Sequence, residues 1–340
     1  MSNTHPIKDE AFVDAINNPT VFDITVIGGG VAGLTAGLYA ARDGFKTLVL
    51  EGDVASSVDM PGGALMLTSE IANYPGFNSA EGAELIEVMR EQAETFGAHI
   101  KEERAAELEI SDGPGKCHFI KSNSGTVYRS RAIIIATGAV ARRLGIPGED
   151  ENYGTGVSSC ATCDGFFFQD KVVAVVGGGD TAVEDALLLT HYATKVHLLV
   201  RGNSLRSTVP EAREIVDHPD VEVHWDTTAE EVFSEDSKVT GLKINTKGVE
   251  SKLAIDGLFV AIGSDPATGF LDGSGVPVEA DGYIAVNEAS TAILGLEGRG
   301  IFAAGDVADR IYRQAITSAG KAAQAALEAR AYLNSSRHKI

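Results

Sequence analysis

The amino-acid sequence predicts an α/β protein with two Rossmann-like domains, the second inserted into the first, and three observations support this prediction. The chain has 340 residues, which suggests two domains at about 150 residues per domain. Residues 23–51 follow a strand–turn–helix–strand pattern around the glycine-rich turn GGGVAG. Residues 172–200 repeat this pattern without a gap and share seven identical positions with the first copy. Such a repeat is typical of two dinucleotide-binding modules in one chain.

The elements of the first module follow in order from the hydrophobic pattern. DITVI (23–27) predicts a buried parallel strand, residues 34–44 a helix, and TLVLE (47–51) a second strand. Short alternating segments between residues 99 and 130 indicate a β-meander, and RAIIIATGA (131–139) predicts another buried strand.

The second module shows the same succession after its repeat. Residues 221–255 again have the character of a meander, and GLFVAIG (257–263) echoes the earlier strand RAIIIATG. A last strand at 300–306 and a helix at 314–333 follow. Each domain is therefore expected to have the three-layer ββα arrangement.

The domain boundaries are expected at short hinges, because no linker rich in proline and serine separates the modules. We place the hinges near residues 140 and 268, which gives a discontinuous first domain (1–140 and 269–340) and an inserted second domain (141–268). Residues 1–20 are expected to form an arm or short helix, and residues 335–340 a loose tail.

Composition and charge exclude several classes of protein. Hydrophobic residues make up 44% and charged residues 22%, which excludes a disordered or coiled-coil chain. The net charge of −20 disfavours nucleic-acid and membrane partners. The N-terminus lacks signal-peptide character, and the longest uncharged run, Ile24 to Ala41, is too short and rich in glycine for a membrane span. We therefore expect a cytoplasmic enzyme.

The first glycine fingerprint is Gly28-x-Gly30-x-x-Gly33. These glycines permit a tight turn, close approach to a pyrophosphate and close packing of the helix on the strand. Glu51 ends the next strand, where a carboxylate accepts a hydrogen bond from a ribose 2′-hydroxyl. The alternative is a glycine-rich turn in another α/β fold. A further candidate is Asp306, at the end of the last strand, which suits sugar or ribityl hydroxyls or, alternatively, a helix N-cap.

The second fingerprint is Gly177-x-Gly179-x-x-Ala182. Here the acidic residue is absent, and Arg201 and Arg206 follow the second strand. Arginine binds a 2′-phosphate, whereas a carboxylate repels one. The first module is therefore predicted to bind FAD and the second NADP(H). The alternative for both arginines is an ordinary surface position.

The Cys-x-x-Cys motif Cys160-Ala161-Thr162-Cys163 is the main candidate for a metal-binding or redox-active group. Zinc is not expected there, because Cys117 is alone and no pair of histidines has metal spacing; the eight histidines are interpreted as structural or surface residues. A redox disulfide is favoured. Asp164 is either its general acid/base or a turn residue. Since the disulfide and the nicotinamide both belong to the second module, they are expected to reach the flavin alternately through a hinge motion.

From about residue 22 to 333 the sequence resembles the bacterial-type, low-molecular-weight thioredoxin reductases. The most specific matches are CATCDGFFF (160–168), GGGDTAVEDAL (177–187) and GIFAAGDVADRIYRQAITSAG (300–320). The resemblance implies a homodimer that passes a hydride from NADPH to FAD and then electrons to the Cys160–Cys163 disulfide. It implies that Cys163 faces the flavin, that Cys160 attacks oxidised thioredoxin, and that Asp164 is the acid/base.

The resemblance also implies binding residues. Arg142 resembles an arginine near the surface that docks thioredoxin. The residues that the resemblance implies for FAD binding are Gly28, Gly30, Gly33, Glu51, Gly63, Asn73, Thr137, Gly138, Asp306, Arg313, Gln314 and Ala315. Those expected to bind NAD(P)H are Gly177, Gly179, Asp180, Thr181, Ala182, Arg201 and Arg206.

Two departures from the family pattern are expected to matter. The phosphate motif His-Arg-Arg-x-x-x-Arg reads Val200-Arg201-Gly202-x-x-x-Arg206. Losing an ionic contact costs on the order of 1.5–3 kcal/mol, so NADH is not excluded as a donor. The family's Gly-Gly-Gln-Leu motif is Gly-Gly-Ala64-Leu in this chain, which removes an amide near the flavin.

These departures keep open a related oxidoreductase or oxidase acting on another dithiol or disulfide. A non-enzymatic redox sensor is disfavoured, because the Cys-x-x-Cys and both fingerprints are intact.

Overall fold

The computed structural model describes residues 20–54, 60–68, 70–77, 81–113 and 116–337. The arm expected at residues 1–20 lies outside this part of the chain except for its last residue, as do residues 338–340 of the expected tail. The chain divides into two compact units: unit 1 comprises residues 1–70, 74–140 and 265–340, and unit 2 comprises 71–73 and 141–264. The final return of the chain from unit 2 to unit 1 therefore falls at 264/265, four residues before the position expected from the sequence.

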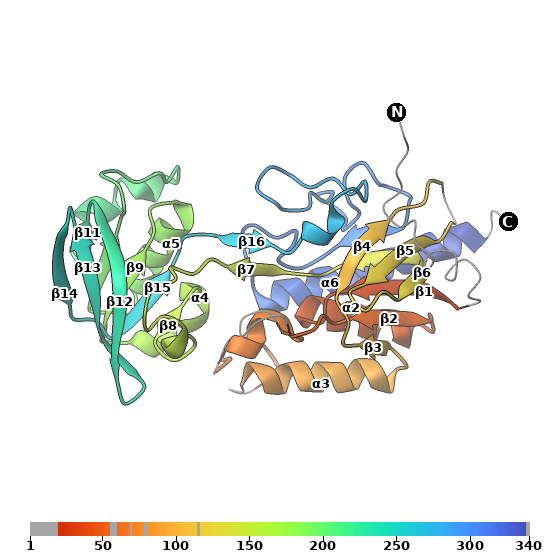
Figure 1. Cartoon of the computed structure of the whole chain (residues 1–340), viewed down its shortest axis with the longest axis horizontal. Coiled ribbons are helices and arrows are strands. Elements are labelled where there is room, and N and C mark those ends of the chain that lie inside the picture. Colours follow the sequence, from red (N-terminus) through yellow and green to blue (C-terminus); the bar gives the residue numbers. More distant parts are fainter. Residues whose placement is uncertain (1–19, 55–59, 69, 78–80, 114–115, 338–340) are drawn as a thin grey trace. The chain divides into compact units, whose positions relative to one another are not determined.

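The sheet of unit 1 has the strand order β3-β2-β1-β6-β5-β4, and one further strand, β17, pairs with β6 (Figure 1). Strands β1, β2, β3, β6 and β17 are parallel, whereas β4, β5 and β6 form an antiparallel meander. The strands are β1 (Val21–Ile27), β2 (Thr47–Leu50), β3 (His99–Lys101), β4 (Ala105–Glu109), β5 (His118–Ser122), β6 (Val127–Ile135) and β17 (Ile301–Ala303).

Strand β3 differs from the sequence-based expectation, which assigned residues 99–130 to one meander. It pairs in parallel with β2, in the register Leu48–His99 to Leu50–Lys101. The reason is the connection: helix α3 (Gly82–Thr95) leads from β2 into β3, and a strand that follows a crossover helix enters a sheet in parallel.

Both faces of the central parallel strands of unit 1 are buried, which explains their continuous apolar sequences. Ile24, Val26 and Ile134 contact helices α2 (Val31–Arg42) and α6 (Ala315–Arg337). Ile133 and Ile135 point to the opposite face, onto the meander and the segment that precedes β17. Helix α6 continues past the expected end at residue 333, so residues 335–337 are helical rather than part of a loose tail.

Unit 2 consists of a five-stranded parallel sheet, order β11-β10-β9-β15-β8, a helix α5 on one face and a three-stranded antiparallel sheet, β12-β13-β14, on the other. This confirms the three-layer ββα prediction. The elements are β8 (Val157–Ser158), α4 (Ala161–Asp164), β9 (Val172–Val176), α5 (Asp180–Leu189), β10 (Lys195–Leu199), β11 (Val221–His224), β12 (Thr227–Glu235), β13 (Lys238–Thr246), β14 (Val249–Leu253) and β15 (Gly257–Val260).

Two short strands carry the chain into and out of residues 141–264, the long segment of unit 2. Strand β7 (Ala139–Ala141) leaves unit 1, β16 (Ser264–Pro266) returns to it, and the two pair with each other. Short 3₁₀ helices in the described residues are η1 (Gly63–Leu67), η2 (Asp150–Asn152), η3 (Gly165–Phe168), η4 (Pro210–Ala212), η5 (Ile215–Asp217) and η6 (Gly269–Leu271). Among the described residues, no helix combines the length and the apolar character needed to cross a bilayer.

Candidate active site

The first fingerprint forms the turn between β1 and α2. Gly28 has φ +122°, and a Cβ there would lie 2.1 Å from the carbonyl oxygen of Ala136. A Cβ on Gly33 would lie 1.8 Å from the carbonyl oxygen of Gly28. Both positions therefore require glycine. Gly30 is the N-cap of α2 and offers no capping side chain, so the first N–H groups of the helix are suited to an anion.

Glu51 lies against this turn. A Cβ on the neighbouring Gly29 would be 2.3 Å from the Cβ of Glu51. The Glu51 side chain is only 6% exposed and accepts two hydrogen bonds from Arg90 of α3, from Nε at 3.1 Å and from Nη2 at 3.0 Å. Arg90 was missed by the sequence analysis, because no local motif links it to a residue 39 positions away.

Gly63 and Ala64 start η1 beside the same turn. Gly63 has φ +70°, and a Cβ on it would lie 3.6 Å from the Cα of Gly30. Ala64, which replaces the glutamine of the family motif, is exposed. The segment that departs from the family pattern is therefore adjacent to the fingerprint.

Asp306 is brought to α2 from the end of β17. Its neighbour Gly305 has φ +80°, and a Cβ there would lie 2.8 Å from the Cβ of Ala32. Asp306 accepts a hydrogen bond of 3.0 Å from Oγ of Ser318, and burial raises the pKa of its carboxyl. Helix α6 begins only at Ala315, so Asp306 is not the N-cap of that helix.

The residues Arg313, Gln314 and Ala315 lie where the loop enters α6. Arg313 has φ +46°. The Asp309 carboxylate accepts hydrogen bonds from the backbone N–H groups of residues 311–313 at 2.9, 2.9 and 3.1 Å. Asp309 was not singled out from the sequence, yet it fixes the conformation of this loop.

The other residues predicted to bind FAD have different surroundings. Thr137 donates from Oγ1 to the carbonyl oxygen of Ala267 at 2.8 Å, and Gly138 accepts from the N–H of Ala267 at 3.0 Å. Both residues thus tie β6 to the returning chain. Asn73 belongs to the segment 71–73, which groups with unit 2, whereas the other residues of this set belong to unit 1.

The second fingerprint forms the turn between β9 and α5. Gly177 has φ +157°, and a Cβ on it would lie 2.3 Å from the carbonyl oxygen of Ala261 and 2.7 Å from the Cβ of Ala182. Alanine at position 182 is fully buried, which explains why a small residue suffices in place of the third glycine. Gly179 is the N-cap of α5, and a Cβ there would meet no atom within 4 Å. The turn is therefore open at the helix N-terminus.

Asp180 has a partner that the sequence did not predict. Its Oδ1 accepts hydrogen bonds from Oγ of Ser207 at 2.8 Å and from the N–H of Thr208 at 2.6 Å. These bonds, the one from the Thr208 backbone foremost, lower the pKa of Asp180. The N–H of Arg206 donates to the carbonyl oxygen of Gly178 at 2.7 Å. Asp180 thus holds the loop 201–208 against the fingerprint turn.

This loop carries the two predicted phosphate-binding cations. Arg201 and Arg206 are exposed, and Gly202 between them is also exposed. Val200 is only 3% exposed and packs in the core of unit 2, so the position of the family's histidine is taken here by a core residue. Thr181 lies partly buried in the first turn of α5.

Cys160 and Cys163 form a disulfide at the start of α4. Cys160 is the N-cap of this helix, and its Sγ accepts a hydrogen bond of 3.1 Å from the N–H of Cys163. The N–H of Cys160 in turn donates to Oγ of Ser158 at 3.0 Å. An N–H aimed at a sulfur stabilises its thiolate, which is the nucleophilic form.

Asp164 follows directly and lies partly buried. Burial raises the pKa of its carboxyl, against the effect of a hydrogen bond with Ser158. A carboxyl that keeps its proton to a higher pH than usual is suited to exchange protons with a thiol. The next aromatic residue, Phe166, is 58% exposed and makes edge contacts with Phe167 and Tyr192.

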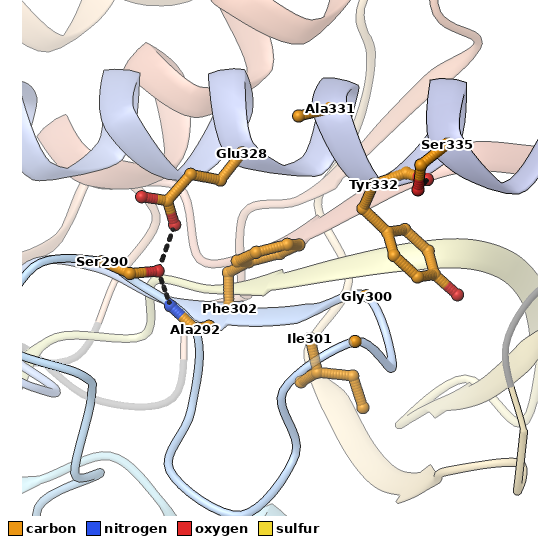
Figure 2. A pocket seen from close by; sticks show the side chains of 10 residues that line it. Ser290, Ala292, Gly300, Ile301, Phe302, Glu328, Ala331, Tyr332 and Ser335 are labelled. Atoms are coloured by element: carbon orange, nitrogen blue, oxygen red, sulfur yellow. Dashed lines mark hydrogen bonds between the residues drawn. The ribbon is translucent and has the colours of Figure 1, made fainter.

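A surface pocket of about 470 Å³ lies elsewhere in unit 1. In Figure 2, side chains of α6, including Glu328 and Tyr332, face Ser290 and the start of β17. Glu328 accepts a hydrogen bond of 2.8 Å from Oγ of Ser290. It lies 13 residues after Ala315 in the same helix, a distance of about 20 Å along the axis. This pocket is therefore separate from the loop at the start of α6.

The chain also matches known proteins. Residues 22–326 match the pyridine nucleotide-disulphide oxidoreductase family. The thioredoxin reductase of Streptomyces coelicolor is 43% identical over 316 residues, which cover 92% of this chain and 94% of that protein. The bifunctional thioredoxin reductase/thioredoxin of Mycobacterium leprae is 42% identical over 92% of this chain and 66% of its own length. The structure of thioredoxin reductase from Giardia duodenalis superposes with a TM-score of 0.85 at 35% identity, covering 92% of this chain and 99% of that one.

Two glycine-fingerprint domains and one Cys-x-x-Cys disulfide define a nucleotide-dependent disulfide oxidoreductase. The chain belongs to the pyridine nucleotide-disulphide oxidoreductase family and, within it, groups with the thioredoxin reductases.

Proposed function

We propose that the chain is an NADPH-dependent thioredoxin reductase, with FAD in unit 1 and NADPH in unit 2. The observation that carries this proposal is the Cys160–Cys163 disulfide, which lies in the same unit as the second fingerprint. The identity of 43% to a thioredoxin reductase over nearly the whole chain supports it.

The residues present fit both dinucleotides. In unit 1, the uncapped N-terminus of α2 is suited to a pyrophosphate, and Glu51 and Asp306 lie beside the same helix end as acceptors for hydroxyl groups. In unit 2, the N-terminus of α5 is open at Gly179, and exposed Arg201 and Arg206 follow β10. When bound, FAD would relay electrons from the nicotinamide to the disulfide.

The chain's own sulfur chemistry follows from the two cysteines. In the reduced form, the N–H of Cys163 favours the thiolate of Cys160. This thiolate attacks one sulfur of the substrate disulfide, forms a mixed disulfide and releases the other sulfur as a thiolate. Cys163 then attacks Sγ of Cys160, which restores the enzyme disulfide and releases the second substrate thiolate. Asp164 takes up and returns the proton of the attacking thiol. In sum, NADPH, one proton and the substrate disulfide give NADP⁺ and a dithiol.

The substrate is proposed to be thioredoxin on a separate chain. The Mycobacterium leprae relative bears both activities in its name, which supports this choice. Phe166, 58% exposed and three residues after Cys163, offers an aromatic anchor for a docked protein. The family resemblance further supports a homodimer, and a dithiol enzyme of this kind is suited to the reducing cytoplasm. The net charge of −20 disfavours nucleic acid and membrane as partners.

The test is NADPH oxidation coupled to oxidised thioredoxin. We expect turnover in the unaltered enzyme, none in Cys160→Ser or Cys163→Ser, and full activity in Cys117→Ser, since Cys117 lies outside the disulfide. Asp164→Asn should slow turnover without loss of the disulfide. A protein whose disulfide is reduced by NADPH but which fails to turn over thioredoxin would contradict the proposed substrate and favour another disulfide compound.

A further inference from the structure

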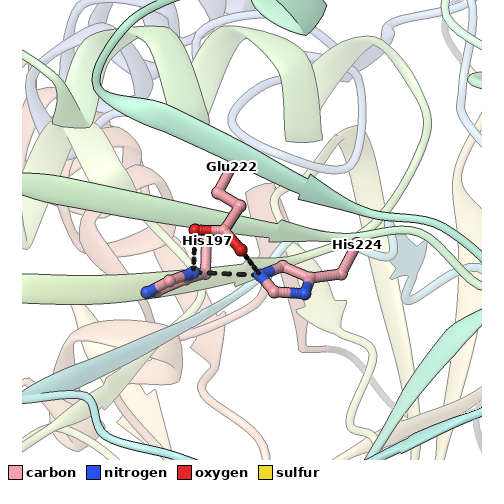
Figure 3. A group of neighbouring side chains, drawn as sticks. All are labelled: His197, Glu222 and His224. Atoms are coloured by element: carbon pink, nitrogen blue, oxygen red, sulfur yellow. Dashed lines mark hydrogen bonds and ion pairs between the residues drawn. The ribbon is translucent and has the colours of Figure 1, made fainter.

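Three side chains that commonly bind metal ions lie together on the outer strands of unit 2. His197 is on β10, and Glu222 and His224 are on the edge strand β11 (Figure 3). The sequence analysis interpreted the histidines as structural or surface residues, because no pair had metal spacing. The parallel pairing of β10 with β11 brings His197 beside Glu222, and so brings together two histidines 27 positions apart.

The edge strand places this group far from the disulfide in the order of the sheet. Strand β11 is the last strand on one side, whereas β8, which leads into Cys160, is the last on the other. The group is also distinct from the fingerprint turn, which follows β9. Neither the proposed reductase activity nor the expected nucleotide contacts account for it.

The distances suit a single small cation. Nδ1 of His197 lies 3.0 Å from Nε2 of His224. The oxygens of Glu222 lie 3.8 Å from the first nitrogen and 3.6 Å from the second. In a tetrahedral zinc site, ligand atoms about 2.1 Å from the ion are about 3.4 Å apart. The three observed separations lie on either side of this value, so shifts of a few tenths of an ångström would place all three groups around one ion.

The ligand atoms also have suitable charges. Burial lowers the pKa of His197 and of His224, which favours neutral imidazoles. One of the two facing nitrogens carries the proton of their shared hydrogen bond, and that imidazole must change tautomer to offer its lone pair to an ion. Burial would raise the pKa of Glu222, but Lys195 and the two histidines outweigh it and lower the pKa. Two imidazoles and one carboxylate are the protein ligands of many zinc sites that keep a fourth position for water.

Lys195 is the competitor for the carboxylate. Its ammonium lies 3.4 Å from an oxygen of Glu222, and its side chain is 34% exposed. A bound cation must therefore displace Lys195 from Glu222, and the partly exposed side chain of Lys195 can turn into solvent. The zinc affinity depends on Lys195 only if Glu222 is a ligand. A substitution of Lys195 therefore distinguishes a metal site from two imidazoles that merely share a hydrogen bond.

We propose that His197, Glu222 and His224 bind a zinc-class divalent cation at the outer strand pair of unit 2. The site is continuous with the loop that begins at Arg201. The N–H of Val200 donates to the carbonyl oxygen of His224 at 2.9 Å. A bound ion therefore joins β10 to β11 at the point where the chain leaves for the proposed phosphate contacts.

The test is a zinc titration of the oxidised full-length protein after chelator treatment, in competition with a chromophoric zinc chelator. The intact disulfide keeps Cys160 and Cys163 from binding the ion. We expect one zinc per chain, with affinity at least tenfold lower in His197→Gln and in His224→Gln. The matched control is His191→Gln, which replaces an exposed histidine outside the group and should bind as the unaltered chain does.

Lys195→Gln provides the second measurement, because it leaves all three ligands in place. Removal of the competing ammonium should tighten zinc binding about two- to fivefold, as expected for the loss of one exposed ion pair. Absence of binding, or equal binding in both histidine variants and the control, would overturn the proposal. Unchanged affinity in Lys195→Gln would show that Glu222 is not a ligand and would also overturn it.

Discussion

Replacing Arg90 with glutamine tests the group that holds Glu51 beside the first fingerprint. The substitution removes two hydrogen bonds, at 3.1 and 3.0 Å, from a carboxylate that is only 6% exposed. Hydrogen bonds to charged groups contribute about 1.5–3 kcal/mol each. Because the Arg90 side chain is 32% exposed, water replaces part of this interaction, and we expect a loss of about 2 kcal/mol for the pair. For a unit of roughly 200 residues this lowers the Tm by about 4–8 °C.

The assay is thermal unfolding of the protein without FAD, followed by measurement of FAD affinity. Arg90→Gln should lower both, because Glu51 then lacks the partner that fixes its orientation. The matched control is Arg330→Gln, which removes a more exposed pair with Asp43 in the same unit and should change the Tm by no more than about 2 °C. Equal Tm values for Arg90→Gln and the unaltered chain would refute the reasoning, as would an Arg330→Gln effect of the same size.

Three further predictions concern other groups. Gly33→Ala places a methyl 1.8 Å from the carbonyl oxygen of Gly28, so the purified protein should lose its FAD on gel filtration; retention of a full complement would contradict this. Arg201→Ala combined with Arg206→Ala should raise the KM for NADPH at least tenfold and leave the KM for NADH unchanged, and equal effects on both donors would disprove a phosphate contact. Burial lowers the pKa of His118 below its ordinary value of 6.5, so the stability it contributes is present above about pH 6.5 and is lost as the pH falls through the lowered pKa. Urea unfolding at pH 7.5 and 5.5 should therefore show a larger loss in the unaltered chain than in His118→Gln, and parallel losses would show that another group titrates.

The parts of the fold that the sequence predicted are those set by local pattern. The strands of both fingerprints are continuous apolar runs, and their turns need glycine because backbone carbonyls approach within about 2 Å of an added Cβ at Gly28 and Gly177. Such requirements are visible in a few adjacent residues. The three-layer order of unit 2 was predicted for the same reason, since its meander and its parallel strands have different periodicities.

The parts that the sequence did not predict are contacts between distant segments. Arg90 pairs with Glu51 from a helix 39 residues away, and His197 meets His224 only because β10 and β11 pair in parallel. Asp309 was missed for a different reason, because its role is to bind backbone N–H groups rather than a cofactor. The strand at residues 99–101 was assigned to the meander, since three residues are too few to show which neighbour they join.

The most direct test of the proposed reductase is an anaerobic titration of the FAD-loaded protein. NADPH is added first and the flavin absorbance is followed, and oxidised thioredoxin is added next. The proposal predicts that NADPH bleaches the flavin and that thioredoxin restores its colour, in the unaltered chain but not in Cys160→Ser. Bleaching without recovery on addition of thioredoxin would contradict the proposed substrate, and a flavin that neither NADPH nor NADH bleaches would contradict the proposed electron donor.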